Sequence, residues 1–137
     1  QNQIAILEKQ NSDIIKQMGD LTKQLALHRH LRIEIVSLWH SSVWSAYGGL
    51  LVSYPFNVTV RNNDLITVSG LTLTVQAFSG LKDETQVPGL RKIDLLQAGE
   101  ERVVSGEVVV YISAPWNLTY VATLKAGDIV IDTFTSP

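Results

Sequence analysis

The sequence predicts a mainly β protein with an N-terminal helix: a seven-stranded antiparallel sandwich of immunoglobulin or fibronectin type, preceded by a long coiled-coil α-helix. Three observations support this fold class. Apolar residues recur every 3.5 residues over the first 30 positions, and from Leu31 the pattern changes to strict alternation of apolar and polar residues. No strand–helix alternation follows, which disfavours a parallel α/β fold. We therefore divide the chain into a helix, 1–30, and a β domain, 31–137.

The helix can be written in heptads with Ile4 at position a. A seam of this spacing needs partner helices, so it predicts a homo-oligomer. Ile15 at an e position widens the apolar stripe and favours a trimer over a dimer. Gly19 at a b position is expected to face solvent. The a and d positions, our predicted oligomerisation residues, are Ile4, Leu7, Asn11, Ile14, Met18, Leu21, Leu25 and His28.

An alternative for this segment is an amphipathic helix that packs on its own sandwich, because helical apolar spacing usually means packing against a core. We prefer self-association, since the stripe is almost restricted to a and d and the helix is long for a small sandwich. Asn11 at an a position is then a candidate for fixing register and oligomer number.

Seven segments of the β domain alternate as half-buried strands do. The first could instead extend the helix, but its β-branched residues favour a strand. The residues between the segments are turn formers, such as Asn62-Asn63-Asp64, and residues 41–49 and 80–89 are expected to be loops. The predicted strands are 31–35, 56–61, 71–77, 92–96, 102–112, 118–124 and 129–135.

Two stretches carry a resemblance to known families. Phe56 to Asp64, followed by the strand at 71–77, resembles the strand, asparagine-rich turn and strand of LEA14-like, CARDB-like and FxLYD-like modules. Leu95 to Arg102 resembles their glycine–glutamate turn. The resemblance covers about residues 50–135. It implies an extracytoplasmic β-sandwich module behind a coiled coil and a membrane anchor, and it implies no catalytic residues.

Two N-glycosylation sequons are present, at Asn57 and Asn117. In each predicted strand the asparagine and the threonine share the outer face, while the middle residue points into the core. This parity suits an acceptor that must be exposed, although chance alone produces about one such motif in a chain of this composition.

Aromatic residues gather in the segment that follows the helix. Trp39, Trp44 and Tyr47 are candidate binding residues, because dense aromatics often anchor partners or sugars. The competing interpretation is that they fill the core where the helix joins the sandwich.

Composition and motifs argue against catalysis, metal binding and cofactor binding by this chain. It has no cysteine, which excludes disulfides, thiolate metal sites and a cysteine nucleophile. Nucleotide-binding, metalloprotease and hydrolase motifs are missing from the sequence. We expect no catalytic residues, no metal and no cofactor. Weaker alternatives are a metal or pH-sensitive ring of His28 and His30 in an oligomer, and a calcium site formed by Asp64, Asp128 and Asp132.

These observations predict a non-enzymatic cell-surface module for structure, assembly or adhesion, in which a self-associating stalk presents a β-sandwich head. The alternative is a sensor ectodomain that binds a ligand or carbohydrate through the aromatic segment. The net charge of −2 divides into +1 for residues 1–30 and −3 for the remainder, which disfavours nucleic acid. The expected partners are copies of the chain and another surface protein. Membrane attachment is expected only through a segment before Gln1, and the location is extracytoplasmic.

Overall fold

The chain forms one helix and two packed antiparallel sheets, as described by a computed structural model for residues 3–28, 31–115 and 117–136. The helix α1 spans Gln3–His28. No helix in these ranges is long and apolar enough to cross a membrane. The strands are β1 (Ile33–His40), β2 (Ser45–Gly48), β3 (Leu51–Asn62), β4 (Val68–Ser79), β5 (Lys82–Asp83), β6 (Thr85–Val87), β7 (Gly89–Leu96), β8 (Glu101–Tyr111), β9 (Thr119–Ala126) and β10 (Ile129–Ser136).

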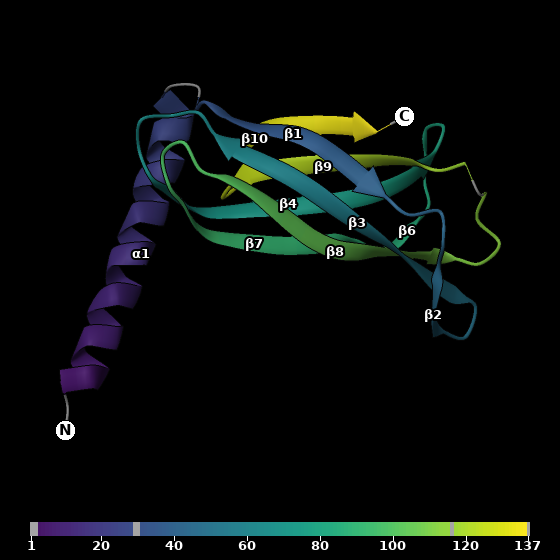
Figure 1. Cartoon of the computed structure of the whole chain (residues 1–137), viewed down its shortest axis with the longest axis horizontal. Helices are drawn as coiled ribbons and strands as arrows, with labels where there is room; N and C mark the ends of the chain where they lie inside the picture. The colour runs from purple at the N-terminus through teal and green to yellow at the C-terminus, as the bar shows by residue number, and fades with distance from the viewer. Residues whose placement is uncertain (1–2, 29–30, 116, 137) are drawn as a thin grey trace.

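The first sheet has the order β1-β3-β8-β6, with β2 also paired to β3, and the second has the order β10-β9-β4-β5, with β7 also paired to β4. All pairs are antiparallel. The sheets face each other as a sandwich, and α1 leaves one end of it at a steep angle (Figure 1). The hairpin of β2 and β3 projects at the opposite end.

The described residues form ten strands, whereas the sequence pattern predicts seven. The seven expected segments correspond to β1, β3, β4, β7, β8, β9 and β10. The three additional strands, β2, β5 and β6, lie in segments expected as loops, and each pairs with one end of a long strand. They are too short to show a recognisable alternation of apolar and polar residues. Their extended backbone depends on pairing with the neighbouring long strand.

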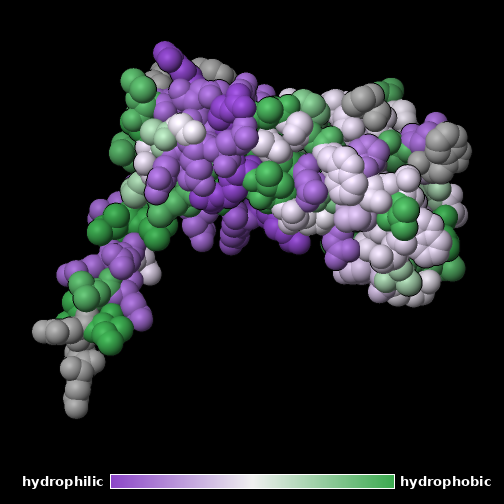
Figure 2. All heavy atoms as spheres, viewed as in Figure 1, coloured by the Kyte–Doolittle hydropathy of each residue, from purple (hydrophilic) through white to green (hydrophobic). Residues whose placement is uncertain are grey.

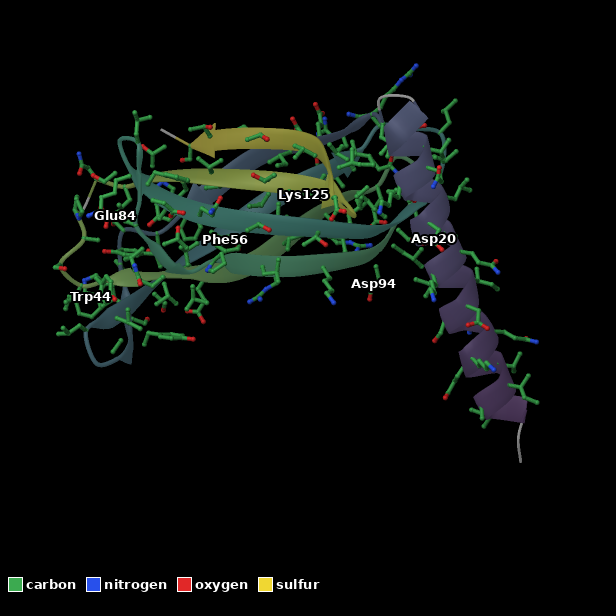
Figure 3. The ribbon with its side chains drawn as sticks, turned by 180° about the vertical axis from the view of Figure 1, so that it is seen from behind. Asp20, Trp44, Phe56, Glu84, Asp94 and Lys125 are labelled. Atoms are coloured by element: carbon green, nitrogen blue, oxygen red, sulfur yellow. The ribbon has the colours of Figure 1, made fainter. Side chains whose placement is uncertain are left out.

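The core lies between the sheets and follows the predicted alternation. Val58 and Val60 of β3 and Leu73 and Val75 of β4 belong to one core cluster, and all four are fully buried. Phe56 is the largest fully buried side chain, and Figure 3 shows it midway along the sandwich, between the two sheets. A well-filled apolar interior of this kind stabilises the head.

The turn before β8 is built by one carboxylate. The backbone N–H of Gln97 donates to Glu100 Oε1 at 2.8 Å, and Arg102 donates to Glu100 Oε2 at 2.6 Å. These two donors hold the pKa of Glu100 below its usual value. Gly99 occupies the left-handed position of this turn, with φ of 75°. The predicted glycine–glutamate turn is therefore present.

Candidate functional site

The helix has two halves with different surroundings. Every described side chain from 4 to 14 is exposed, so the first half projects from the sandwich into solvent (Figure 1). From Ile15 onward the helix contacts its own head, mainly β4, with further contacts to β9 and β10. The alternative of a helix packed on its own sandwich thus holds for the C-terminal half alone.

A short hydrogen-bond chain fastens this C-terminal half to the head. Thr22 is buried, and its hydroxyl donates to the carbonyl of Met18 at 2.7 Å within the helix. The same oxygen accepts the backbone N–H of Ser69 at 3.2 Å. Ser69 Oγ donates in turn to the carbonyl of Ile15 at 3.0 Å. Because a buried polar group needs its partner, these bonds fix the position of the helix along β4 as well as its rotation.

Glycines allow the helix backbone to approach the sheet closely. A Cβ on Gly19 would lie 3.5 Å from Ser69 Oγ, and one on Gly70 would lie 3.3 Å from the Cα of Gly19. A Cβ on Gly127 would lie 2.9 Å from Cδ of Lys23. The expectation that Gly19 faces solvent is therefore wrong: it is half-buried at the helix–sheet contact. The heptad assignment describes contacts between helices, so it does not predict which side of α1 packs on the β-sandwich.

The predicted seam is divided between the two surroundings. Its a positions Met18 and Leu25 are partly buried, and Leu25 packs against the core. Its first a position, Ile4, is 70% exposed, and its described d positions, Leu7, Ile14 and Leu21, are between 52 and 58% exposed. Asn11 is also exposed. Ile15, expected to widen the seam, instead contacts the head, and the side chain of His28 lies outside the described residues, as does His30.

The predicted aromatic binding residues lie at the end of the head opposite the helix. Trp39 is on the outer face of β1, while Trp44 and Tyr47 belong to the segment that forms β2. All three are exposed, so they do not fill the junction between helix and head. Figure 3 shows Trp44 at the far end of the sandwich from Asp20, which lies on the helix.

The two sequons differ in accessibility. Asn57 lies within β3, paired to β1 and β8, and its Oδ1 accepts a hydrogen bond from Ser105 Oγ at 2.6 Å. Asn117 lies in the loop before β9 and is exposed. The middle residues, Val58 and Leu118, are buried as predicted.

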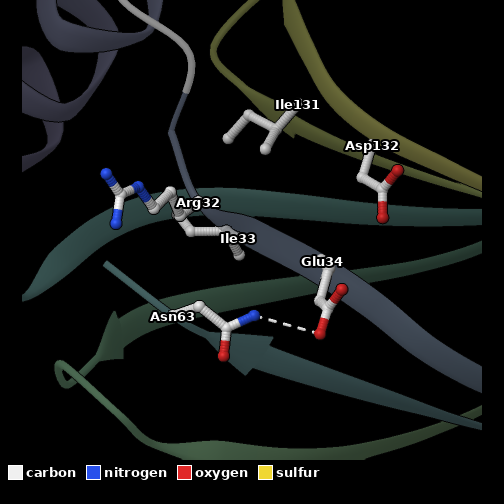
Figure 4. A pocket seen from close by; sticks show the side chains of 6 residues that line it. All are labelled: Arg32, Ile33, Glu34, Asn63, Ile131 and Asp132. Carbon is white, nitrogen blue, oxygen red and sulfur yellow. Dashed lines mark hydrogen bonds between the residues drawn. The ribbon is translucent and has the colours of Figure 1, made fainter.

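Two carboxylates at the helix end of the head accept hydrogen bonds from backbone N–H groups. Asp64 Oδ2 accepts the N–H of Arg32 at 3.2 Å, and Asp132 Oδ2 accepts the N–H of Ile35 at 2.7 Å. An open depression beside β1 is lined by Arg32, Glu34, Asn63, Asp132 and two isoleucines, and Asn63 Nδ2 donates to Glu34 Oε1 at 3.0 Å (Figure 4). Among the described residues, no three acidic or histidine side chains converge as metal ligands. The predicted grouping of Asp64, Asp128 and Asp132 is therefore not formed.

Tyr120 of β9 is buried below the ring of His40 on β1. The ring centroids are 4.2 Å apart and the planes are tilted by 30°. Burial raises the pKa of Tyr120 to about 12, with a smaller contribution from Tyr54. The neutral phenol is thus part of the contact between the two sheets.

This pKa predicts a loss of stability in alkali. In the unfolded chain the phenol ionises near pH 10, whereas in the folded head it stays protonated. The contribution of Tyr120 is therefore fully present below about pH 10 and is lost between about pH 10 and 12, which we expect to lower the free energy of unfolding by about 2–3 kcal/mol. Denaturant unfolding at both ends of this range measures it. Tyr120→Phe should lose less stability over the same range, and an equal loss in both proteins would contradict the assignment.

Comparison with known proteins relates the head to other sandwiches. No family model matches the chain, and no curated protein matches it. A β-glucuronidase of glycoside hydrolase family 2 has a TM-score of 0.64 and 14% identity, covering 77% of this chain and 12% of the enzyme. A putative β-galactosidase from Bacteroides fragilis has a TM-score of 0.59 and 13% identity, covering 77% of this chain and 17% of the other. A β-glucuronidase from Bacteroides uniformis has a TM-score of 0.57 and 16% identity, covering 75% and 14%.

This chain therefore spans less than a fifth of the length of those enzymes. At these identities the likeness shows the fold alone: a β-sandwich of two antiparallel sheets.

Proposed function

We propose that the protein is a non-enzymatic assembly module of a cell surface, in which a stalk helix associates with copies of itself and presents the β-sandwich head. The observation that carries this proposal is the free half of α1. Its apolar side chains, Ile4, Leu7 and Ile14 among them, are exposed and repeat at seam spacing. Exposed apolar side chains in a continuous row are typical of a surface that another protein covers.

Helix energetics favour a partner for this half. A free segment of about 12 residues is marginal as an isolated helix, because nucleation is costly and few side chains pack. Partner helices stabilise it by burying the a and d side chains. Copies of the chain supply the same seam, so a homo-oligomer meets this need without a second protein.

The contacts with the head define which residues the stalk can use. Leu25 is already packed against the core and Met18 is partly buried, so association would rely on Ile4, Leu7, Asn11 and Ile14, with Leu21 at the end nearest the head. Asn11 is the residue we expect to fix register. We keep the preference for a trimer.

A two-site charge variant tests the stalk. Leu7→Lys with Ile14→Lys should turn an oligomer into a 15.1 kDa monomer at ~10 µM, because lysines in a small apolar seam are unpaired when buried. Light scattering coupled to size exclusion measures the mass. The matched control is Ala5→Lys with Ser12→Lys, which adds the same charge on the b positions of the same turns and should keep the oligomer. A wild-type chain that is monomeric under these conditions would overturn the proposal.

The cell-surface location belongs to the same proposal. The exposed loop position of Asn117 supports glycosylation there better than at Asn57, whose side chain is engaged with Ser105. Another surface protein is a further proposed partner. The immunoglobulin or fibronectin type of the head and its likeness to the LEA14-like, CARDB-like and FxLYD-like modules are also proposals.

A second candidate function is a sensor that binds a ligand or carbohydrate. The exposure of Trp39, Trp44 and Tyr47 favours it. The depression beside β1 and a second one between α1 and Gly70, Asp94 and Gly127 both lie at the helix end of the head, however, and neither is lined by these rings. We therefore place assembly first.

A further inference from the structure

The end of the head farthest from the helix carries an exposed apolar group that we call the hairpin tip: residues 43–50 together with Tyr111 and Ile112. The tip is continuous, because Leu51 pairs with Tyr111 and the N–H of Ile112 donates to the carbonyl of Leu50 at 2.7 Å. Its side chains reach well into solvent, with Val43 73% and Leu50 71% exposed.

The tip lacks charge. No Asp, Glu, Lys or Arg occurs in residues 35–60 or in residues 108–124, the two stretches that build it. Figure 2 shows the distribution on one face: hydrophilic residues gather over the half of the sandwich near the helix, whereas the opposite end is mostly neutral or hydrophobic with a few hydrophilic residues among them. Because charges across an interface are usually complementary, the surface of a partner that binds at this end is expected to carry little charge.

β2 adds an open sheet edge to this apolar surface. It pairs with β3 on one side, and in the described part of the chain no strand pairs with its other side. An edge strand offers unpaired N–H and C=O groups to another strand, and proteins usually protect such edges with charges, proline or a covering segment.

The other edges of the two sheets have that protection. The edge strands β1 and β10 contact each other, and Asp132 of β10 accepts the N–H of Ile35 of β1. β5 consists of Lys82 and Asp83, and β7 carries Arg91, Lys92 and Asp94. β6 lies between Glu84 and Pro88. β2, with the sequence Ser45-Ala46-Tyr47-Gly48, has no such residue.

We propose that the hairpin tip is a second contact surface, at which β2 pairs antiparallel with β2 of another copy of this chain. An uncharged surface is compatible with itself, and two identical strands can pair antiparallel about a two-fold axis. Strand pairing satisfies the open backbone groups of β2. A lipid surface would cover the apolar side chains but leave these groups unpaired, at a cost of several kcal/mol each in hydrocarbon.

The tip contact goes beyond the proposed function and is independent of the stalk. It is small, so a weak and transient association is expected at this site. Together with a stalk oligomer at the opposite end, it would link one oligomer to the next through their heads.

The absence of cysteine allows a clean test in the full chain. Single cysteines at each position of Ser45–Gly48, in the Leu7→Lys, Ile14→Lys background, should form disulfide-linked dimers under mild oxidation. One or two adjacent positions should react at least about tenfold faster than Leu81→Cys, a fully exposed site in another loop of the head, because pairing raises the effective concentration of the thiols.

Adding Trp44→Lys, at an exposed tip position beside β2, to the fastest cysteine variant should reduce its rate to that of the Leu81→Cys control, whereas adding Leu65→Lys, at an exposed site near the helix, should not. Equal rates of disulfide formation at all cysteine positions would overturn the tip contact. Binding of the tip to lipid vesicles or to a different protein, with such equal rates, would also count against pairing of two β2 strands. A stalk that fails its own test would leave these rates unchanged, so the two proposals fail separately.

Discussion

Replacing Gly89 by alanine should destabilise the head by several kcal/mol, more than most single methyl additions in a protein core. The reason is the ring of Phe56. A Cβ on Gly89 of β7 would overlap Cε2 of this ring and lie 3.1 Å from the carbonyl oxygen of Glu107. Gly89 is itself buried in strand geometry, so the ring or one of the two sheets must move. Thermal and urea unfolding of Gly89→Ala beside the wild-type protein measures the effect.

A second glycine reports on the same contact. Gly106 of β8 lies directly opposite Phe56 in the sheet, and a Cβ there would be 2.7 Å from Cζ of the ring. Glycine in a strand usually weakens it, and these two positions are an exception because a close approach requires them. Gly106→Ala should therefore also destabilise the head.

A double-mutant cycle measures how much of the cost of Gly89→Ala is due to the Phe56 ring. Phe56→Leu alone should cost about 1–2 kcal/mol, since the core loses ring volume. Combined with Gly89→Ala, it should recover part of the cost of the alanine, because a leucine leaves room for the new methyl. Val68→Ala, a core truncation at the other end of β4 where Val68 pairs with Leu96, is the control partner and should add its cost without recovery. Additive costs for Phe56→Leu and Gly89→Ala would contradict the steric explanation.

The sequence predicts the long strands well because each is buried on one face. Alternation at 56–60 and 71–77 therefore coincides with the buried rows of β3 and β4. The asparagine-rich turn is also predictable. The role of Asn62 within it is not: this side chain is fully buried, and its amide donates to the carbonyls of Ile66 and Leu96 at 2.9 and 3.0 Å. Only the folded arrangement brings Leu96 to that position.

The candidate site is predictable in part. The heptad pattern identifies the apolar stripe of α1, because side-chain spacing is local information. It could not reveal that Gly19 and Thr22 contact the head, since packing between helix and sheet depends on distant partners such as Ser69 and Gly70. The open edge of β2 was missed for a similar reason: it arises from the length of β3, which extends beyond β1 and leaves room for a second, short partner.

A second large effect is expected at the contact between the C-terminal half of α1 and β4. Gly19→Leu should separate the C-terminal half of α1 from the sandwich, because its side chain would have to fit where a Cβ already lies 3.5 Å from Ser69 Oγ and 3.8 Å from the Cα of Gly70. Thr22 and Ile15 would then lose their hydrogen bonds with Ser69. We expect a loss of several kcal/mol in the docking of the helix, with the sandwich still folded.

Hydrogen exchange resolves this expectation residue by residue. In Gly19→Leu, amides of residues 15–26 should exchange at least about a hundredfold faster, which corresponds to roughly 2.7 kcal/mol, while those of β3 and β8 keep their protection. Asp20→Leu places the same side chain one residue later, at an exposed position, and should leave the amides protected. If both variants retained a protected helix, close packing at Gly19 would not be what holds the stalk to the head. A docked helix fixes its orientation relative to the head, so in the proposed oligomer this contact would determine how the sandwiches are arranged.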